Sequence, residues 1–394
     1  MLTIYPPKLD LTEEGALLTS EFVIEEKKQS LWYLFPREYK DDLVTERLDA
    51  FVVGLLFLAL KTGNDIYVKG SLSARLHYTI NQYLIPAICL GNPSFKKIKV
   101  ESEILSHENL NIKRLSATGL SCGVDSFATY ITHLDEESEY KISYFTYFNA
   151  GSHGDLGGAN TRGIYHERLN RIEEFANHVN IPLITVDTNL SELLQLNFQQ
   201  THSLRNISCV LHLQKIFAHY YYASAYRLDH FRINLKDTSD SDILYLFLLS
   251  TESTTFFSSV SQYSRVERTL LIAKYPLTFR YLDVCTNPRE TDQFINCSVC
   301  YKCLRTQLTL DVAGCLEEYK CVFDIQKYKR VKKRYLGELL SKNNKSPLDN
   351  ELIEFINTEN PIPKYKSILY TMNHRFLKIK KDIKKEIKKL IFKK

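Results

Sequence analysis

The sequence predicts an α/β protein whose central part is a doubly wound parallel sheet. From residue 112 onward, short apolar runs alternate with helical patterns, as expected where crossover helices join parallel strands. A polar, glycine-bearing turn at 119–126 follows the first apolar run, and four of the nine cysteines lie within residues 285–303. With 394 residues and 44% hydrophobic content, the chain can bury more than one core, so we expect two domains and a tail.

Residues 1–110 are expected to form a smaller α/β module. Strands are predicted at 21–25, 30–35, 66–69 and 97–103, and helices at 41–61 and 71–87. The longest apolar run, Ala50 to Leu60, has eleven residues between charged flanks; this is about half a membrane span and indicates a buried helix, so we expect a cytoplasmic protein. No catalytic group stands out here. We interpret the module as a lid or substrate-gripping part, with an independent activity as the alternative.

Residues 119–126, here called the octet, read Gly-Leu-Ser-Cys-Gly-Val-Asp-Ser between a predicted strand at 112–118 and a predicted helix at 124–134. A small polar turn at this place directs several backbone N–H groups one way. Together with the dipole of the following helix, those groups favour an anion such as a phosphate chain. The alternative is an ordinary turn, because Ser, Gly and Asp are also common turn and N-cap residues. No Gly-Lys-Ser/Thr follows, so the octet is not a Walker A loop.

The central domain continues with alternating elements. Further strands are predicted at 141–148, 181–186 and 231–235, and helices at 161–179 and 207–226. Ligands bind outside the carboxyl ends of parallel strands, so the loop at 149–155 is expected to line the nucleotide pocket. Its candidates are Asn149, Gly151 and His153, although His153 equally suits a simple turn. Asp187 ends the third strand. A carboxylate at this place can bind ribose or magnesium, or it can only cap the N-terminus of the next helix.

Polar residues after these strands supply the remaining candidates. His202 and Arg205 precede the predicted helix at 207–226, and an arginine near a polyphosphate offers bidentate donors. Residues 236–264 are interpreted as a long substrate-recognition loop, in which Glu252 is the leading candidate to bind an amine or a base edge. A solvated connector is the alternative for this segment. Arg265 opens the helix that follows.

The cysteine cluster predicts a structural metal site. Cys297, Cys300 and Cys303 are spaced C-x2-C-x2-C, and Cys285 lies upstream of them. Four thiolates suit a tetrahedral Zn²⁺, and two-residue spacers let consecutive ligands wrap one ion. An iron–sulfur cluster is the alternative. A disulfide framework is not expected, because the chain is long and its cysteine count is odd.

The octet resembles the phosphate loop of the PP-loop ATP pyrophosphatases, which have an adenine nucleotide alpha-hydrolase-like (HUP-like) fold and cleave ATP between its α and β phosphates. Together with the cysteine spacing and Leu204-Arg205-Asn206, it resembles the 7-cyano-7-deazaguanine synthases over roughly residues 112–310. Cys122 replaces the first glycine of the family pattern. The usual Asp-Tyr substrate stretch of the family is not evident, which leaves the acceptor open. The chain is thus similar to a larger, divergent member with an added N-terminal part.

The resemblance implies ATP, Mg²⁺ and Zn²⁺ as cofactors, with a PP-loop domain over 111–310. Asp125, Arg205 and Arg265 are the expected catalytic residues, beside His202 and Glu252 as substrate candidates. The residues expected at the nucleotide are Ser121, Cys122, Gly123, Val124, Asp125, Ser126, Asn149, Gly151, His153 and Asn206.

Three functions are consistent with these residues. The first is an adenylate-forming C–N ligase, in which a carboxylate or amide oxygen of a small-molecule or acyl substrate attacks the α-phosphorus and an amine then displaces AMP. The second is sulfur transfer, as in other PP-loop branches. The third is a non-catalytic nucleotide-binding scaffold. The sequence does not name the acceptor or the pathway.

The C-terminal part is predicted to be a helical region at 311–372 and a basic amphipathic tail at 373–394. In the tail, apolar residues recur at helical spacing among lysines, as suits an anionic membrane, a protein partner or RNA; a solvated terminal helix is the alternative. The net charge of +5 comes from this tail, so a general nucleic-acid groove is not indicated. A homodimer is also among the expected partners.

Overall fold

The computed structural model describes residues 1–234, 236–286, 293–342, 345–363, 365–372, 374 and 376. It divides into two compact units. The first, called the sheet unit, comprises Met1–Ser121 and Thr129–Gln262; the second, called the helical unit, comprises Cys122–Ala128 and Tyr263–Lys394. The described residues contain no helix that is both long and apolar enough to cross a membrane.

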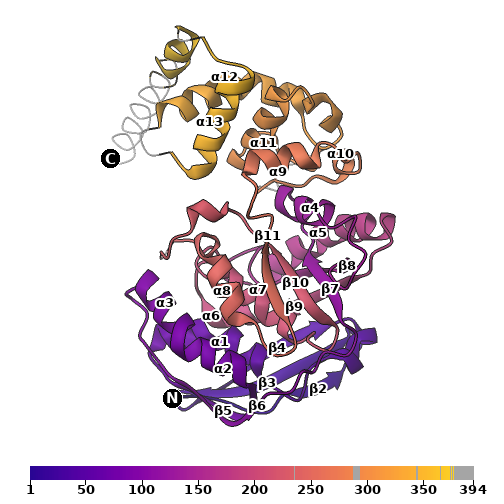
Figure 1. The fold of residues 1–394 in the computed structure, drawn as a ribbon, viewed down its shortest axis with the longest axis vertical. Helices are drawn as coiled ribbons and strands as arrows, with labels where there is room; N and C mark the ends of the chain where they lie inside the picture. Colours follow the sequence, from indigo (N-terminus) through magenta and orange to yellow (C-terminus); the bar gives the residue numbers. More distant parts are fainter. Residues whose placement is uncertain are drawn as a thin grey trace, which may run out of the picture. The chain divides into compact units, whose positions relative to one another are not determined.

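The sheet unit carries a mixed eleven-stranded sheet (Figure 1). Five adjacent strands that follow residue 110 pair parallel with one another, in the spatial order β11-β10-β7-β8-β9. They are β7 (Leu115–Gly119), β8 (Ile142–Asn149), β9 (Leu183–Thr188), β10 (Phe217–Ala223) and β11 (Thr255–Ser259). The chain runs outward from β7 to β9 and then returns to the other side of β7 as β10. This is a doubly wound order, whose switch point lies between β7 and β10. The predicted α/β class with a largely parallel sheet is therefore confirmed.

The first 110 residues extend this same sheet rather than forming a sheet of their own. β4 (Lys27–Phe35) pairs antiparallel with β9, and β3 (Ala16–Ile24) pairs with β4. The remaining strands are β1 (Leu2–Ile4), β2 (Lys8–Leu11), β5 (Ile66–Ser73) and β6 (Val100–Ser106). The boundary expected at residue 110 therefore separates two halves of one sheet, because the edges of β4 and β9 satisfy each other's backbone groups.

Helices pack on the sheet and form the hydrophobic core together with it. α1 (Asp49–Thr62) is buried almost all round, as its apolar run predicts, and packs on α6 (Leu190–Leu194) and α7 (His202–Leu211). The sheet unit also contains α2 (Ala74–Thr79), the π-helix η2 (Ile80–Leu84), α3 (Ile85–Gly91), α5 (Ala159–His178), α8 (Asp242–Leu249) and three short 3-10 helices, η1 (Arg37–Asp42), η3 (Leu228–His230) and η4 (Thr238–Asp240).

Three elements after residue 200 differ from the sequence prediction. The helix predicted at 207–226 is wrong: α7 ends at Leu211, and the aromatic run that follows forms β10. The fourth strand is therefore β10, whereas the described part of 231–235 is irregular. The segment 236–264 is not one long loop, because it contains α8 and β11. Tyrosine and phenylalanine favour strands flanked by other strands, and this context outweighed the helical pattern.

The helical unit is built from capped helices. α9 (Arg265–Ile272) begins with a capping box of Ser264 and Glu267, and α13 (Pro347–Glu359) has one made by Ser346 and Asp349. The others are α10 (Thr278–Tyr281), α11 (Tyr301–Val312) and α12 (Ile325–Ser341); α9, α11 and α13 pack together. α4 (Val124–Ile131) begins in this unit. Most of the tail predicted at 373–394 lies outside the described residues.

Candidate functional site

The octet forms the strand–turn–helix that its sequence predicts. β7 ends at Gly119 and α4 begins at Val124. Between them Cys122 has φ 55°, the left-handed region in which glycine is the usual residue. The carbonyl of Gly123 accepts the N–H of Phe127 at 3.0 Å and the hydroxyl of Ser126 at 3.1 Å. Cys122 thus adopts a backbone conformation that a glycine would adopt without strain.

Asp125, in the first turn of α4, is held by two arginines of α9. Its Oδ2 lies 2.7 Å from Arg265 Nη2, and its Oδ1 lies 2.9 Å from Arg268 Nη1. The side chain of Arg268 is fully buried and that of Asp125 is 22% exposed. The structure therefore brings together two residues expected from the sequence and adds a third. The spacing of Arg265 and Arg268, which places them on one helix face, was the signal that sequence reasoning missed.

Among the side chains that the structure describes, positive charge exceeds negative charge around this carboxylate. Burial lowers the pKa of Arg265 to about 10, an effect that Asp125 opposes and that Arg305 and Arg268 reinforce. Glu351 accepts the backbone N–H of Arg265 at 2.8 Å. Three guanidinium groups thus face two carboxylates, and the helix dipole of α4 adds to the positive potential. Such a surplus suits a phosphate chain, which guanidinium groups bind through paired N–H donors.

At the carboxyl ends of β8 and β9, a polar cluster is organised around Asp187. Asn149 donates its amide to Asp187 Oδ1 at 2.7 Å, and Arg162 donates Nε to Asp187 Oδ2 at 2.8 Å. Arg162 also bonds Glu192 Oε1 at 2.8 Å. The side-chain carbonyl of Asn149 is buried without a hydrogen-bond partner. Because β8 is the neighbour of β7, this oxygen is at the sheet edge where a nucleotide is expected.

His153 is packed among tyrosines in the loop after β8. Its Nε2 lies 2.6 Å from the hydroxyl of Tyr147, whose ring stacks on Tyr165. Burial, with a smaller effect from Arg168, lowers the pKa of His153 to about 3, so the imidazole is neutral. A neutral imidazole packed between tyrosine rings fits a rigid aromatic side of the loop better than a charged contact to phosphate.

Arg205 is a buried positioning group for the same loop. Its side chain donates to Thr201 Oγ1 at 2.7 Å, to Ser191 Oγ at 2.9 Å and to the carbonyl of Leu196 at 2.7 Å. A Cβ on Gly151 would lie 2.5 Å from Arg205 Nη1, so glycine is needed where the loop crosses the guanidinium. Arg205 therefore holds the backbone of the loop, whereas the sequence suggested a direct role in catalysis.

His202 and Asn206 meet Tyr222 on β10. His202 Nδ1 lies 2.6 Å from the hydroxyl of Tyr222, and Asn206 donates to that hydroxyl at 3.3 Å. His202 Nε2 lies 3.1 Å from Asp237 Oδ1. These two candidates thus lie near the carboxyl half of β10, within a network of polar side chains.

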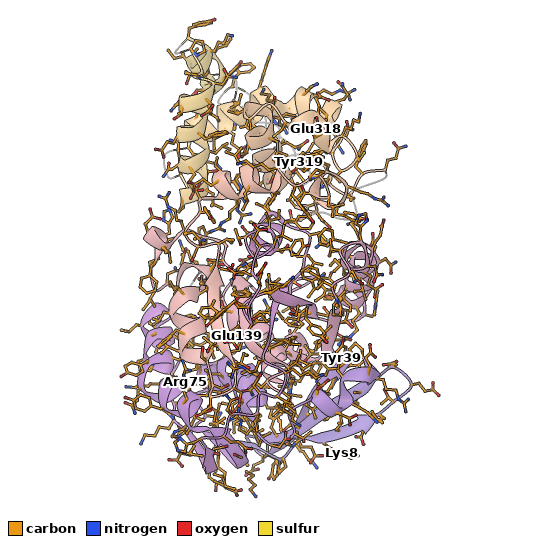
Figure 2. The ribbon with its side chains drawn as sticks, turned by 45° about the vertical axis from the view of Figure 1, so that its right-hand side comes forward. Lys8, Tyr39, Arg75, Glu139, Glu318 and Tyr319 are labelled. Atoms are coloured by element: carbon orange, nitrogen blue, oxygen red, sulfur yellow. The ribbon has the colours of Figure 1, made fainter. Side chains whose placement is uncertain are left out.

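Glu252 lies at the opposite edge of the sheet, before the amino end of β11. Its carboxylate accepts the hydroxyl of Ser73 at 2.6 Å and the backbone N–H of Arg75, labelled in Figure 2, at 2.8 Å. Arg47, which is buried, reaches it at 3.4 Å. Parallel strands place ligands at their carboxyl ends, so the position of Glu252 fits an internal ion-pair network rather than substrate binding.

The four cysteines predicted as metal ligands converge in the helical unit. The Sγ atoms of Cys285, Cys297, Cys300 and Cys303 all lie within 4.8 Å of one another. Tetrahedral Zn²⁺ with Zn–S bonds of about 2.3 Å requires sulfur–sulfur distances of about 3.8 Å, so the donor set fits such an ion.

The backbone around the cysteines is arranged as a metal knuckle. Cys297 donates its N–H to Cys285 Sγ at 3.4 Å, and Cys300 donates its N–H to Cys297 Sγ at 3.3 Å. Ser298 adopts φ 63°, which turns the chain between two ligands. Such N–H donors stabilise thiolate charge, and Cys300 also caps α11. The four-cysteine cluster compatible with metal binding is therefore confirmed.

Compared with known proteins, the chain matches no family model, no curated protein and no solved structure, so its function is inferred from its own residues.

Proposed function

We propose that this protein is a PP-loop ATP pyrophosphatase that forms an acyl adenylate from a substrate carboxylate and lets an amine displace AMP from it, as in the 7-cyano-7-deazaguanine synthases. The observation that carries the proposal is the pair of arginines on Asp125 at the start of α4. Asp125 belongs to the octet itself, and the two arginines reach it from α9. A phosphate-binding turn needs fixed cations beside its backbone donors, and Arg265 and Arg268 of α9 would supply them.

In the proposed reaction, the turn from Ser121 to Ser126 holds the β and γ phosphates of ATP. A carboxylate oxygen of the substrate attacks the α-phosphorus, and the bond to the bridging oxygen breaks to release pyrophosphate. The acyl adenylate then loses AMP to an amine or ammonia, which gives up a proton. Arg265 and Arg268 would neutralise charge that develops on the leaving pyrophosphate, so positioning and electrostatics supply most of the acceleration.

Two metal ions accompany this proposal. Mg²⁺ would be held mainly by phosphate oxygens, because both oxygens of Asp125 are already occupied by arginines. Zn²⁺ would be held by the four cysteines and would serve structure, since four thiolates leave no open position for water. An iron–sulfur cluster at the same place would instead favour sulfur transfer, and assay of acid-labile sulfide separates the two.

The test is product analysis with the purified full-length protein, Mg²⁺, ATP and 7-carboxy-7-deazaguanine. We expect AMP and pyrophosphate in equal amounts and a substrate mass changed to that of an amide or nitrile. Arg268→Lys should lower pyrophosphate release by at least about tenfold, because lysine cannot reproduce the paired donors. Arg114→Lys is the control, since Arg114 is 70% exposed and pairs with Glu139. Formation of ADP and phosphate, or no turnover with any carboxylate, would contradict the proposal.

A further inference from the structure

The proposed reaction needs a group that takes a proton from the amine. When the amine attacks the acyl adenylate, a C–N bond forms, and the nitrogen must lose a proton as AMP leaves. Asp125 does not suit this task, because both of its oxygens are bound by arginines. His153 does not suit it either, because burial lowers its pKa to about 3. The proton must therefore go to another side chain near the carboxyl ends of the parallel strands.

Tyr222 lies at the carboxyl end of β10, beside the start of the octet. In the parallel pair of β10 and β7, Tyr221 is the partner of Thr118, which places Tyr222 level with Gly119, the first residue of the octet. Paired strands are about 4.8 Å apart, so Tyr222 is only one strand away from this turn. Its side chain is partly buried and faces α7. Tyr222 is therefore among the residues at which a substrate is expected.

The hydroxyl of Tyr222 is bonded to a buried histidine. His202 Nδ1 lies 2.6 Å from this hydroxyl, and the planes of the two rings differ by 7°. His202 is 6% exposed, and Phe198 packs against it with ring centroids 5.5 Å apart. Asn206 donates its amide to the same hydroxyl at 3.3 Å. The phenol and the imidazole are thus held at a distance across which a proton can move directly.

Asp237 determines which nitrogen of the histidine carries the hydrogen. Its Oδ1 lies 3.1 Å from His202 Nε2, and Ser239 Oγ lies 3.0 Å from the same nitrogen. Burial raises the pKa of Asp237, but the hydrogen bond and charge of His202 and the donors of Ser239 outweigh burial and lower that pKa overall. The carboxylate is therefore ionised and only accepts hydrogen bonds. Nε2 then carries the hydrogen, and Nδ1 accepts from Tyr222.

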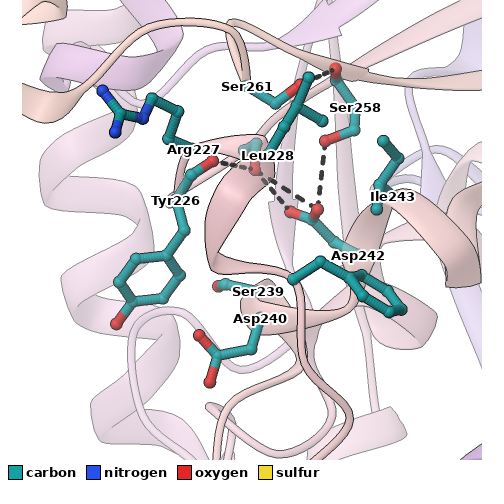
Figure 3. Close-up of a pocket in the computed structure, with 11 residues that line it drawn as sticks. Tyr226, Arg227, Leu228, Ser239, Asp240, Asp242, Ile243, Ser258 and Ser261 are labelled. Carbon is teal, nitrogen blue, oxygen red and sulfur yellow. Dashed lines mark hydrogen bonds between the residues drawn. The ribbon is translucent and has the colours of Figure 1, made fainter. Parts of the chain in front are cut away.

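The other two acids of this segment are bonded elsewhere. Asp240 accepts from Arg232 Nε at 2.8 Å, and Asp242 accepts the hydroxyl of Ser258 at 3.1 Å. Both acids line a small pocket at the carboxyl ends of β10 and β11, which Figure 3 shows in close-up. Asp237 is thus the acid of this segment that serves the histidine.

We propose that Tyr222 takes a proton from the attacking amine while it gives its own proton to His202, which Asp237 orients. The C–N bond forms, and the bond between the acyl carbon and the oxygen of AMP breaks. One amine proton moves to Tyr222 Oη, and the phenolic proton moves to His202 Nδ1. Asp237 stabilises the resulting imidazolium until it loses a proton to water, as the acid does in serine–histidine–aspartate triads. Tyr222 is the catalytic residue, and the other two act through it. This inference rests on the proposed function.

The test separates the two half-reactions of the purified full-length protein. Exchange of labelled pyrophosphate into ATP measures adenylation of 7-carboxy-7-deazaguanine, and amide formation with ammonia measures transfer. Tyr222→Phe should keep the exchange rate within about threefold and lower amide formation by about 100-fold or more, the usual contribution of acid–base catalysis. His202→Gln should behave in the same way. Asp237→Asn should lower amide formation by at least about tenfold, because an amide permits the wrong tautomer of the histidine.

Tyr221→Phe is the matched control. Tyr221 is the next residue on β10, so its side chain is on the opposite face of the sheet, where its hydroxyl donates to the carbonyl of Tyr140 at 2.8 Å. This variant loses a bonded hydroxyl, as Tyr222→Phe does, but it should keep both half-reactions. Hydroxylamine is a stronger nucleophile than ammonia and loses its proton more easily. It should therefore restore part of the transfer in Tyr222→Phe, which a damaged fold would not allow.

The tautomer of His202 is a readout that needs no turnover. Nitrogen NMR, assigned by comparison with His202→Gln, should find the hydrogen on Nε2. Hydrogen on Nδ1 would overturn the inference, because that nitrogen could not accept the proton of Tyr222.

The half-reactions distinguish failure of this inference from failure of the proposed function. Amide formation at the wild-type rate by Tyr222→Phe, or equal loss of both half-reactions with an unchanged Tm, removes only the role of Tyr222. Should Tyr222→Phe misfold, His202→Gln decides in its place by the same comparison. If the wild type exchanges no pyrophosphate, the proposed function is wrong, and this inference falls with it.

Discussion

Arg268 donates from Nη1 to Asp125 Oδ1 at 2.9 Å while its own side chain is fully buried, and this contact joins residues 143 positions apart in the sequence. Arg268 Nε also bonds the carbonyl of Tyr263 at 3.1 Å. A buried guanidinium needs a counter-charge, and Asp125 supplies one. Asp125 thus occupies the arginines that a phosphate chain would otherwise engage.

We therefore predict that Asp125→Ala lowers stability and creates an anion site. The change leaves Arg265 and Arg268 without their carboxylate, which should cost about 2–4 kcal/mol after allowance for the partial exposure of Asp125. About 20 mM sulfate should raise the Tm of the variant more than that of the wild type, because the dianion replaces the lost charge. Differential scanning calorimetry with an Asp135→Ala control checks this. Equal stabilisation of both proteins by sulfate would refute it.

The four-cysteine cluster is expected to bind one metal ion per chain. Elemental analysis should find about one zinc per chain, and Cys297→Ser should abolish its retention, because three thiolates hold Zn²⁺ more weakly. Cys321→Ser should retain the metal, since Cys321 is exposed and outside the cluster. A strong chelator should lower the Tm of the wild type to that of Cys297→Ser. Visible absorbance near 400 nm with acid-labile sulfide would show an iron–sulfur cluster instead.

The left-handed conformation of Cys122 predicts which substitutions are tolerated. Cys122→Gly should change the free energy of unfolding by less than about 1 kcal/mol, because relief of backbone strain offsets the lost side chain. Cys122→Val should cost roughly 2–3 kcal/mol, since a β-branched residue is disfavoured at this φ. Urea denaturation measures both. Cys209→Val, at a buried helical position, is the control and should cost less. If Cys122→Val left the free energy of unfolding unchanged, the inference of backbone strain at this position would be wrong.

His212 predicts an acid-sensitive core. Its ring lies 4.3 Å from Tyr33 and 4.9 Å from Phe51, and burial lowers its pKa to about 3. Below about pH 6.5, His212 is protonated in the unfolded chain but stays neutral in the folded chain. The contribution of His212 to the free energy of unfolding is therefore complete above that pH and decreases as the pH falls toward 3. Between pH 6.5 and 5 the loss should be about 2 kcal/mol at 1.36 kcal/mol per unit. His212→Phe should remove this component in urea titrations, whereas parallel pH curves for the two proteins would rule it out.

Glu252 is predicted to stabilise the fold without touching substrate. Glu252→Gln weakens its bonds to Ser73 and Arg47, which should cost about 1–3 kcal/mol because Arg47 is buried. The KM for the acceptor should stay within about twofold of the wild type, since a group remote from the ligand edge contributes no binding energy. Glu136→Gln, at an exposed position, is the control. A raised KM with unchanged stability would assign Glu252 to the substrate instead.

Local patterns predicted much of the central domain correctly. β8 and β9 lie where continuous apolar runs were found, and the octet makes the expected strand–turn–helix. β10 was missed because helical and strand patterns overlap in a short aromatic segment, and only pairing with β7 and β11 selects the strand. Arg205 was identified as important, but its role as a buried loop anchor depends on groups from several elements.

The sequence by itself determined the parallel core, the octet and the four sulfur ligands, because each depends on residues close together along the chain or on a fixed spacing. Only the tertiary structure decided that residues 1–110 extend the sheet through β4 and β9, that Arg268 pairs with Asp125, and that Asp240 and Asp242 share a pocket. The β4–β9 pairing and the Arg268–Asp125 pair bring together parts that are far apart in the chain. The pocket shared by Asp240 and Asp242 depends on where the ends of two strands lie. Such juxtapositions follow from burial and loop closure over the whole fold, which no local pattern encodes.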